Sequence, residues 1–554
     1  MPPERDRISY NGVGVIELAD ILIKNGLIVD GTGGAAYEAD IAIDEGRIAD
    51  IGRKLSCEAG EVIDASGLVV APGFIDTHSH NDLVPFMDQR IGNLKLLQGV
   101  TTELVAQCGL GVVPCMEAES MVWKNYTRGV VGDPGISWEF SDLDKYFDDI
   151  SSRGLKNNYA ALISHGAVRT YVMGFDNRAP GRAELDDMCR IVDEAMKAGA
   201  FGMSLGLQYM PAIFSSRDEL IEICKVVKKY DGIVMVHLRN HDSSMADAMD
   251  EIIAVAESSK VRLHISHMRS YNSRELGCSA EVLIEIVEKA IEKGVSITFD
   301  EHLYLSGSTL MTQLLPPWLT DGGSDKLLAR LKDKTVLEKV KAELAGKETH
   351  YKGWDNYSAI NGWDAILITS VKTEKNRSYI GKTVGAIAGE LGMHPVDFVA
   401  RLLIEEETGV GIVTLNVFSE EDTIRLIRHP LQMVGSDSIP AGVPHPRLYG
   451  NYPLFIGKFV RDKKVITLEK AINKCTLLPA ETLDIKDRGE LTPGKAADIT
   501  IFDFNEINGF EDYNNSTLPP VGIKHVILNG RIAVRDGKPC TGSHGRVIRH
   551  KGGK

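Results

Sequence analysis

The alternation of hydrophobic and polar residues divides the chain into two kinds of segment. From Ile21 to Val70, and again after Arg488, short runs alternate or are rich in β-branched residues and are separated by Gly or Asp, which is typical of strands. Between these ends, strand-like hydrophobic runs alternate with amphipathic segments of helical period. The pattern predicts a small β-sandwich built from both ends of the chain, enclosing a βαβα region with a parallel sheet.

Eight hydrophobic runs in the middle region are typical of strands, and eight is the strand number of a closed α/β barrel. Gly199 and Gly232 follow two of the intervening amphipathic segments as helix stops. We therefore predict an α/β fold, a (β/α)8 TIM-like barrel over residues 72–485, with the β-sandwich formed by residues 20–71 and 486–550. The predicted strands are residues 73–80, 101–108, 159–165, 201–207, 233–239, 261–267, 296–302 and 431–437.

One connection is far longer than the others. About 130 residues separate the end of strand seven near His302 from the start of strand eight near Leu431, whereas a βα unit needs roughly 30 residues in all. Residues 306–382 contain LLPPWLTDGG and a helix rich in Lys and Glu. We interpret this stretch as an insertion at the active face of the barrel that acts as a lid.

Composition limits the partners of the protein. The 554 residues carry a net charge of −15, so we expect no binding to nucleic acid or to an anionic membrane. No hydrophobic run is long enough for a membrane span, and residues 1–20 lack the hydrophobic stretch of a secretory signal. Eight cysteines without a CxxC pair are too few for a disulfide scaffold, which indicates a reducing, cytoplasmic location.

Candidate metal ligands stand where five of the predicted strands end. In a (β/α)8 barrel the site lies at the carboxyl ends of the strands. A lone His or Cys is more often a packed residue than a ligand, but four of the 15 histidines fall at strand ends that converge. We therefore predict a metal centre formed by His78, His80, Cys108, His237, His267 and Asp437.

The ligand types favour zinc. Imidazole, thiolate and carboxylate together suit Zn²⁺ better than hard ions such as Mg²⁺. A catalytic zinc lowers the pKa of a water to about 7 and polarises a carbonyl, so hydrolysis is the expected chemistry. Four other histidines have different expected places. His165 and His302 lie near the rim, His264 differs in strand parity from the ligand positions and faces the helices, and His241 is solvated or supports a ligand.

Several motifs resemble one known family. FIDTHSHND and RGELTPGKAADITIFD, with the β segments on either side of the barrel, resemble the metal-dependent amidohydrolase superfamily. The chain is further similar to the N-acyl-D-amino-acid deacylase (D-aminoacylase) family from residue 20 to about residue 537. The motifs that carry this resemblance, in the family's order, are VAQCGLGVVP, GLQYMP, VHLRN, HISHMR, SGSTLMTQLLPPW, MVGSDSIP and HPRLYGNYP.

The resemblance implies a zinc-dependent hydrolysis of N-acyl-D-amino acids. In that family a cysteine after strand two replaces the carboxylated lysine of other superfamily members, and here Cys108 is present while FGMSLGLQY has no lysine. One tightly bound zinc would be held by Cys108, His237 and His267. A second, weaker site would use His78, His80 and the shared Cys108. Asp437 would be the general base for the attacking water and would return the proton to the leaving amine.

The resemblance also implies residues that bind the substrate carboxylate. The matching positions are Tyr209, Arg269 and Arg377, with Ser308 in the SGST motif. The chain departs from the family pattern around this pocket. DEHLY, which contains His302, stands where D-x-Y-P-Y is frequent, Asn81 replaces an acid of the first motif, and His241 stands where Glu is common.

Two other functions remain open at this point. A hydrolase of cyclic amides, such as hydantoins or dihydropyrimidines, is disfavoured because such enzymes commonly use the strand-four lysine. A noncatalytic barrel scaffold is disfavoured because it has no need for all six candidate ligands. The sequence leaves open the oligomeric state, the acyl group, the amino-acid side chain, the preference for D over L substrates beyond the resemblance, and the number of metals.

Overall fold

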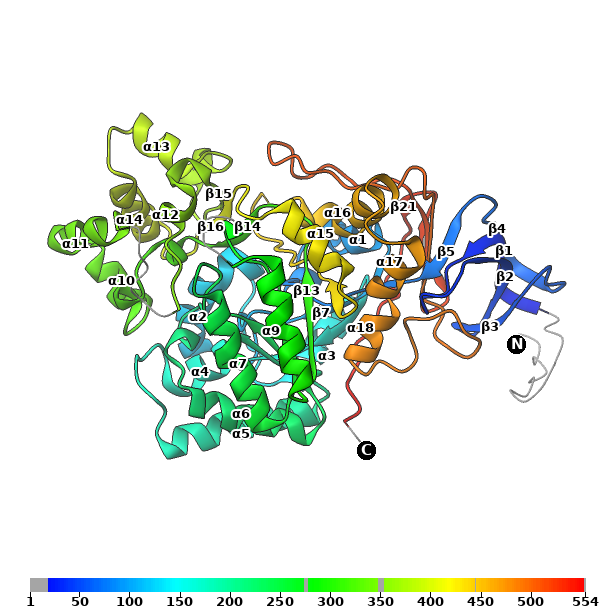
Figure 1. Ribbon diagram of the computed structural model, residues 1–554, viewed down its shortest axis with the longest axis horizontal. Coiled ribbons are helices and arrows are strands. Elements are labelled where there is room, and N and C mark those ends of the chain that lie inside the picture. Colours follow the sequence, from blue (N-terminus) through cyan, green and yellow to red (C-terminus); the bar gives the residue numbers. More distant parts are fainter. Residues whose placement is uncertain (1–17, 274–277, 347–352, 444, 553–554) are drawn as a thin grey trace.

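The computed structural model describes residues 18–273, 278–346, 353–443 and 445–552 (Figure 1). The segment for which we predict no secretory signal, residues 1–20, therefore lies almost wholly outside the described residues. Within those ranges, no helix combines the length and the hydrophobicity needed to cross a membrane.

The middle of the chain forms a series of parallel strands at the eight predicted positions. They occur in a three-stranded sheet, in the order β6–β7–β8, and a six-stranded sheet, in the order β17–β13–β12–β11–β10–β9. One predicted strand is observed as two short ones, β8 and β9. The strands are β6 (Phe74–Asp76), β7 (Val100–Val105), β8 (Asn158–Ala161), β9 (Ile163–Ser164), β10 (Gly202–Gly206), β11 (Ile233–His237), β12 (Arg262–Ile265), β13 (Ile297–Glu301) and β17 (Gln432–Val434).

Backbone contacts join the first and last strands of this series. Ser79, just beyond β6, forms a parallel bridge with Ser438, just beyond β17. The Asp437 N–H donates to the His78 carbonyl at 2.8 Å, and the His80 N–H donates to the Ser438 carbonyl at 3.0 Å. These bonds fix the carboxyl ends of β6 and β17 side by side, where three of the predicted site residues lie.

A buried ion pair supports the same junction. The Lys95 ammonium, 1% exposed, donates to the Asp76 carboxylate and, at 2.6 and 2.8 Å, to the hydroxyls of Ser436 and Ser438. Asp76 also accepts the Ser436 N–H at 2.8 Å. A buried charge pair needs such additional hydrogen bonds to offset its desolvation. The network therefore links the end of β6 to the segment that carries Asp437.

Helices cover the outer face of the strands (Figure 1). Alternate strand residues such as Leu263 and Ile265 belong to the same core cluster as Leu283 and Val287 of a neighbouring helix. This alternation is what a strand packed between helices and an inner core requires. The helices are α1 (Gln89–Leu96), α2 (Glu117–Val131), α3 (Leu143–Arg153), α4 (His165–Met173), α5 (Arg182–Lys197), α6 (Arg217–Lys229), α7 (Met245–Ser259), α9 (Ala280–Glu292), α15 (Glu420–Arg428), α16 (Arg447–Leu454), the π-helical η7 (Phe455–Asp462), α17 (Leu468–Cys475) and α18 (Leu477–Thr482).

Both ends of the chain contribute to one nine-stranded sheet. β5 pairs with β18 in antiparallel register, Val70 opposite Ile501, which joins the N-terminal and C-terminal strands. Val70 and Ile501 face one hydrophobic cluster, and Val69 and Phe502 face a second cluster that includes Phe455 of η7. The strands are β1 (Leu18–Ile28), β2 (Tyr37–Asp44), β3 (Arg47–Gly52), β4 (Glu58–Asp64), β5 (Val69–Pro72), β18 (Ile499–Phe502), β19 (Ile523–Leu528), β20 (Arg531–Arg535) and β21 (Lys538–Pro539).

The last described residues leave this sheet and lie against the parallel strands. The Tyr159 N–H of β8 donates to the Arg546 carbonyl at 2.9 Å, and the Ile548 N–H donates to the Tyr159 carbonyl at 2.8 Å. Residues 546–550, which the prediction assigns to the β-sandwich, therefore also contact the parallel strands of the middle region.

The insertion is larger than predicted and has its own core. β14, β16 and β15 form an antiparallel sheet, so the unit extends past residue 382 to the end of β16 at Thr414. A separate hydrophobic cluster, which includes Leu319, Trp354 and Phe398, fills it. Its elements are β14 (Gly307–Leu310), η3 (Met311–Leu314), η4 (Pro317–Thr320), α10 (Ser324–Arg330), α11 (Lys334–Leu344), α12 (Tyr357–Asn361), η5 (Trp363–Ala365), β15 (Ile366–Ser370), η6 (Glu374–Tyr379), α13 (Val384–Glu390), α14 (Pro395–Glu405) and β16 (Gly411–Thr414).

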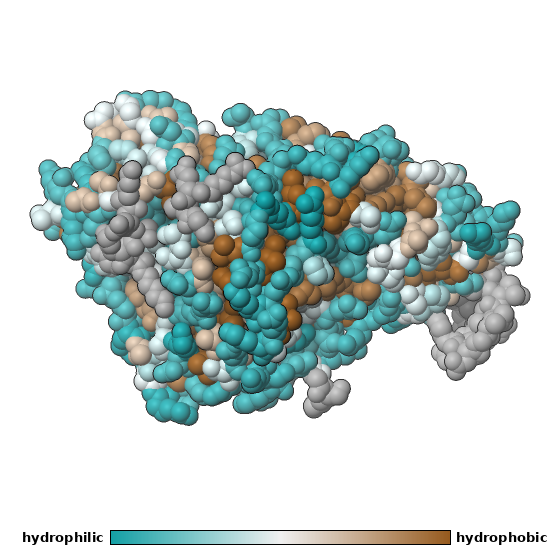
Figure 2. All heavy atoms as spheres, viewed as in Figure 1, coloured by the Kyte–Doolittle hydropathy of each residue, from teal (hydrophilic) through white to brown (hydrophobic). Residues whose placement is uncertain are grey.

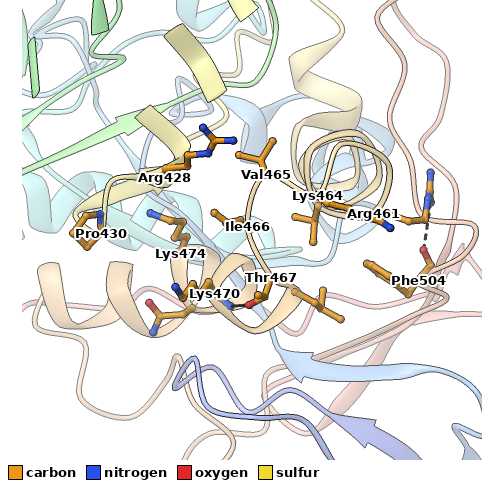
Figure 3. A pocket seen from close by; sticks show the side chains of 13 residues that line it. Arg428, Pro430, Arg461, Lys464, Val465, Ile466, Thr467, Lys470, Lys474 and Phe504 are labelled. Atoms are coloured by element: carbon orange, nitrogen blue, oxygen red, sulfur yellow. Dashed lines mark hydrogen bonds between the residues drawn. The ribbon is translucent and has the colours of Figure 1, made fainter. Parts of the chain in front are cut away.

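A cavity of about 900 Å³ lies on the flank of the barrel, between α15, η7 and α17 (Figure 3). Hydrophobic residues gather on this face of the molecule (Figure 2). Several cations line the cavity, and the ammonium of Lys474 donates to the carbonyls of His429 and Gln432, just beyond the C-terminus of α15. Cations stabilise helix C-termini, so local structure accounts for this charge. The cavity adjoins the amino end of β17, opposite the predicted site.

Candidate metal centre

The structure brings all six predicted ligand residues together at the carboxyl ends of the strands. Each is at most 8% exposed. Their ligand atoms, together with a ring nitrogen of His241, which is not among the six, fall into groups of three within which all atoms lie within 4.8 Å of one another. The groups are His78, Cys108 and His267; His237, His241 and His267; and His78, His80 and Asp437.

Cys108 lies between two imidazoles. Its Sγ is 3.3 Å from the Nε2 atom of His78 and 3.5 Å from the Nε2 atom of His267. The His267 Nε2 atom is in turn 3.0 Å from the Nδ1 atom of His237. The thiol and the three imidazoles therefore direct their donor atoms toward a common region.

Asp437 lies beside the histidine pair of the first strand. Its Oδ1 atom is 3.3 Å from the Nε2 atom of His80 and 3.6 Å from the Nε2 atom of His78. Its Oδ2 atom accepts a hydrogen bond from Nη1 of Arg447 at 2.9 Å. The carboxylate is thus placed between the imidazoles and a buried guanidinium.

Three of the predicted ligand residues have left-handed backbone. The φ angles are 53° at Cys108, 35° at His267 and 48° at Asp437. Side chains other than Gly rarely adopt this region, and such conformations cluster at functional sites. The sharp turns at the ends of β7, β12 and β17 aim these side chains at the same region.

Asp300 orients the imidazole of His78 and holds the backbone of His267. Its Oδ2 atom is 3.3 Å from Nδ1 of His78, so that the Nε2 atom of His78 faces Cys108 and Asp437. Its Oδ1 atom accepts the backbone N–H of His267 at 2.7 Å. Metal-binding histidines are commonly held, as His78 is here, by a carboxylate on the other ring nitrogen.

His264 also contacts Asp300, which corrects its predicted direction. The Nε2 atom of His264 is 3.0 Å from Asp300 Oδ2, so the side chain faces the barrel interior rather than the helices. The predicted direction was wrong because β12 ends at Ile265 and the backbone turns at His267. The alternation of side chains along a strand therefore does not continue from His264 to His267.

His237 is held by a chain of polar contacts that leads into the insertion. Its Nε2 atom is 2.8 Å from Oε1 of Gln208, which leaves Nδ1 for the centre. Gln208 donates through Nε2 to Oδ2 of Asp355 at 2.9 Å, and the other oxygen of Asp355 accepts from Asn240 at 2.9 Å. The insertion therefore supplies a carboxylate that orients a candidate ligand. Gln208 stands in the GLQYMP motif, but no sequence signal marks Asp355.

Burial and charge set the protonation of these groups. Burial lowers the pKa of His237 well below its ordinary value and lowers that of His267 to about 4, so both imidazoles are neutral, the form that binds metal. Burial opposes ionisation of Asp437, but Arg447 and His78 outweigh it and hold the pKa of Asp437 well below its ordinary value. The carboxylate is therefore ionised at neutral pH.

The donor set fits a zinc ion. Sulfur, nitrogen and oxygen donors are mixed within one small volume, as zinc prefers. Some polar atoms of the site have no hydrogen-bond partner among the described residues. They are Nδ1 of His80 and both ring nitrogens of His241, all of them buried. A metal would make use of such donor atoms.

A buried cavity opens beside the donor atoms. Tyr209, whose hydroxyl is 2.8 Å from that of Thr309, lines it, and so does Ser308. The insertion closes one side with Tyr357 and Thr414. The remaining lining residues are His80, Cys108, Leu110, Val130, His237, His241, His267, Tyr271, His302, Gly307, Phe418, Asp437, Ile439 and Arg447.

Comparison with known proteins shows the family to which this chain belongs. A family model described as "Amidohydrolase family" matches residues 61–300 and 352–534. The chain belongs to the amidohydrolase family. The resemblance seen in the sequence motifs is confirmed, since relatives named as deacylases match nearly the whole of this amidohydrolase.

Two such relatives come from Alcaligenes xylosoxydans xylosoxydans. An N-acyl-D-glutamate deacylase is 30% identical, covering 96% of this chain and 97% of its own. A D-aminoacylase is 29% identical with the same coverage. Neither identity favours one substrate side chain over the other.

Solved structures give the same result. An N-acyl-D-glutamate deacylase from Bordetella bronchiseptica, complexed with zinc and a phosphonate inhibitor, has a TM-score of 0.79 at 28% identity and covers 96% of this chain and all of its own. A D-aminoacylase with a binuclear metal centre has a TM-score of 0.80 at 27% identity, with the same coverage. A D-hydantoinase, at 16% identity and a TM-score of 0.53, shares the fold alone.

Two predicted substrate residues of this amidohydrolase lie elsewhere. Arg269 is buried against the ring of Phe418, donates to the Tyr304 carbonyl and contacts His302, and it does not line the cavity. Arg377 lies on η6, 71% exposed, and pairs with Glu374. The resemblance implied a cation that binds the substrate carboxylate, but neither of the two arginines that it indicated lines the cavity.

The cation that lines the cavity is Arg447. It follows Asp437 by ten residues, at the start of α16, in the HPRLYG motif. Its Nε and Nη2 atoms are buried without a partner among the described residues. The motif was visible in the sequence, but the fold is needed to show which arginine reaches the site.

The remaining histidines are also placed. His165 is buried beneath the helices, 3.0 Å from Glu219, and takes no part in the site. His302 lines the cavity, with its ring nitrogens 3.0 Å from the Arg269 guanidinium. His241 lines the cavity as well and is 1% exposed, so the expectation that it is solvated is wrong.

Proposed function

We propose that this amidohydrolase is a zinc-dependent hydrolase of N-acyl-D-amino acids, which cleaves the linear amide bond to give a carboxylate and a free D-amino acid. The observation that carries the proposal is the convergence of a thiol, imidazoles and Asp437 at one end of the strands. The relatives named above, which include deacylases of N-acyl-D-amino acids, support the substrate class.

Cys108, His237 and His267 would hold the tightly bound zinc, and His78, His80 and Cys108 a second, weaker one. When bound, zinc lowers the pKa of a water and polarises the amide carbonyl. Asp300 and Gln208 orient these ligands through His78 and His237. The protein thereby presents the imidazoles in a fixed direction before metal binds.

Asp437 would move the proton. Its ionised carboxylate, 3.3 Å from His80 and paired with Arg447, accepts a proton from the attacking water at Oδ1. It then donates that proton to the nitrogen of the leaving amine. Without the second transfer the amine leaves as a poor, unprotonated group.

Arg447 would bind the free carboxylate of the substrate. Its Nη1 atom already pairs with Asp437, while Nε and Nη2 stay available at the cavity. A guanidinium edge binds a carboxylate through two parallel hydrogen bonds. This contact would place the scissile amide beside Asp437 in the cavity that Tyr209 and Ser308 also line.

The lining favours a neutral amino-acid side chain. Among the described residues Arg447 is the one Lys or Arg that lines the cavity, and the substrate carboxylate uses it. Leu110, Val130, Ile439 and Phe418 supply apolar walls. A second carboxylate would be desolvated there without a second Lys or Arg to pair with, so we expect substrates of the methionine or leucine type to exceed D-glutamate and D-aspartate derivatives.

The architecture that we infer is a closed (β/α)8 barrel with the insertion as a lid. The bonds between the ends of β6 and β17 support closure. Ser308, Tyr357 and Thr414 of the insertion lining the cavity support the lid. The eight free cysteines fit a reducing, cytoplasmic location.

A panel assay tests the function. Release of free amine is measured with N-acetyl derivatives of D- and L-amino acids and with a hydantoin and a dihydropyrimidine, each with and without a zinc chelator. We expect turnover of D-derivatives that the chelator abolishes. Turnover of the cyclic amides alone would instead support a hydantoinase-like enzyme, which β10, lacking a lysine, does not favour.

A further inference from the structure

His241 is a buried histidine whose ring has no hydrogen-bond partner. It follows His237 by four residues, in the loop after β11, and its side chain is 1% exposed. Neither ring nitrogen has a partner among the described residues. Burying a polar group without a partner costs free energy, so such a group in a folded protein points to a ligand or a reactant.

The backbone holds this ring in place. The His241 N–H donates to Oδ2 of Asp355 at 2.9 Å. The His241 carbonyl accepts the N–H of Tyr271 at 2.7 Å and the hydroxyl of Ser270 at 3.0 Å. Contacts from the insertion and from the loop after β12 therefore fix His241, although its ring is unpaired.

The ring faces two of the candidate ligands. Its centroid is 4.7 Å from that of His237 and 5.2 Å from that of His267. One ring nitrogen of each of the three histidines lies within 4.8 Å of the others. Since Nε2 of His237 is bonded to Gln208, the nitrogen that His237 offers to this group is Nδ1.

We propose that His241 is a metal ligand, which with His237 and His267 forms a three-imidazole site. This inference rests on the proposed zinc-dependent function, and in the tightly binding site it gives His241 the place that the proposed function gives to Cys108. Three protein imidazoles with one position left for water or substrate are a ligand set of catalytic zinc. Cys108, which groups with His78 and His267, then serves the neighbouring position.

Cobalt binding tests the assignment without substrate. The metal-free full-length chain and its His241→Gln variant are titrated with Co²⁺, whose visible absorption reports the number and type of ligands. We expect the affinity of His241→Gln for Co²⁺ to fall by more than about tenfold and its visible bands to change in position and intensity. Unchanged affinity and spectrum would overturn the proposal.

Two further variants complete the test, one that keeps a donor atom at position 241 and one that serves as a control. His241→Glu retains a donor oxygen, so we expect affinity closer to the wild type with shifted bands. It decides the question if the Gln variant does not fold, since wild-type bands in His241→Glu would overturn the proposal. His302→Gln removes another imidazole that lines the same cavity but belongs to none of the three groups, and we expect it to leave the spectrum unchanged.

Hydrolysis of N-acetyl-D-amino acids by the wild-type chain is measured in parallel. Hydrolysis together with unaltered Co²⁺ binding by His241→Gln would overturn the role of His241 and leave the proposed function intact. Absence of hydrolysis together with weakened Co²⁺ binding would overturn the proposed function and leave His241 as a ligand.

Discussion

At the scale of single residues, Asp437 combines three properties that a proton carrier needs. It is 8% exposed, it contacts His80 and Arg447, and the latter holds its pKa low. Its left-handed backbone, with φ of 48°, directs the carboxylate into the cavity. Each property follows from its position just beyond β17, where the chain is tied to β6.

Replacing Asp437 by Asn removes the proton acceptor while preserving shape. We expect the hydrolysis rate to fall by at least about 100-fold, the scale of lost general acid–base catalysis. Zinc content should remain near one ion per chain, because Cys108, His237 and His267 are untouched. Rate and zinc content are measured on the same sample. Near-normal turnover would contradict the role of Asp437 as the proton acceptor.

Arg447 and Arg377 form a matched pair. Arg447→Met should raise KM for an N-acyl-D-amino acid by about 10- to 100-fold, the scale of a lost hydrogen bond to a charged group. It should have a smaller effect on the analogue whose carboxylate is blocked as an amide. Arg377→Met removes an exposed side chain and should change neither value. Equal KM values in the two variants would contradict the placement of the carboxylate.

The sequence predicted which residues converge at the strand ends better than it predicted which cation lines the cavity, and the reason is physical. His78, His237 and Asp437 mark the ends of strands, and in this fold strand ends converge. Arg447 lies in a loop and first helical turn after β17, and Asp355 lies in an insertion. Their approach to the site depends on long-range packing, which local patterns do not encode.

At the scale of elements, the insertion lines part of the cavity and contacts Gln208, the partner of His237. The strand positions were predictable because hydrophobic alternation fixes them locally. The end of the insertion was not, since β16 pairs with β14 and β15 across long separations in sequence. Asp355 of the insertion contacts Gln208, and Gln208 contacts His237. The packing of the insertion therefore affects the orientation of a candidate metal ligand.

Asp355→Asn tests this support. The amide replaces one carboxylate oxygen by a donor, so either Gln208 or Asn240 loses its acceptor. We expect zinc affinity to fall by about tenfold or more, as on loss of other groups that orient ligands. Competition with a chelating dye measures it. Asp325→Asn, at an exposed position of α10, is the control, and equal affinities in the two variants would refute the support.

At the scale of the whole molecule, Lys474 of the flank cavity makes the stability of the fold depend on pH, separately from catalysis. Burial lowers the pKa of Lys474 from 10.5 to about 7 in the folded chain. Between these two pH values the unfolded chain binds the proton that the folded chain has lost. Stability contributed by this group therefore rises with pH across that window and is constant below it.

Lys474→Met removes this dependence. The difference in unfolding temperature, wild type minus variant, should increase from pH 7 to pH 10, with a slope of up to about 1.4 kcal/mol per pH unit in free energy. The carbonyls of His429 and Gln432 lose their donor at every pH, so this loss does not affect the slope. Thermal scans of both proteins at several pH values measure it, and a constant difference would contradict the shift.

We propose above all that a zinc centre at the carboxyl ends of the strands hydrolyses N-acyl-D-amino acids. The most direct test is the rate of D-methionine release from N-acetyl-D-methionine by the zinc-loaded full chain, beside the L-enantiomer and a chelator-treated sample. We predict zinc-dependent release from the D-enantiomer, well above that from the L-enantiomer and from N-acetyl-D-glutamate. No release from any N-acetyl-D-amino acid by the zinc-loaded chain would contradict the account.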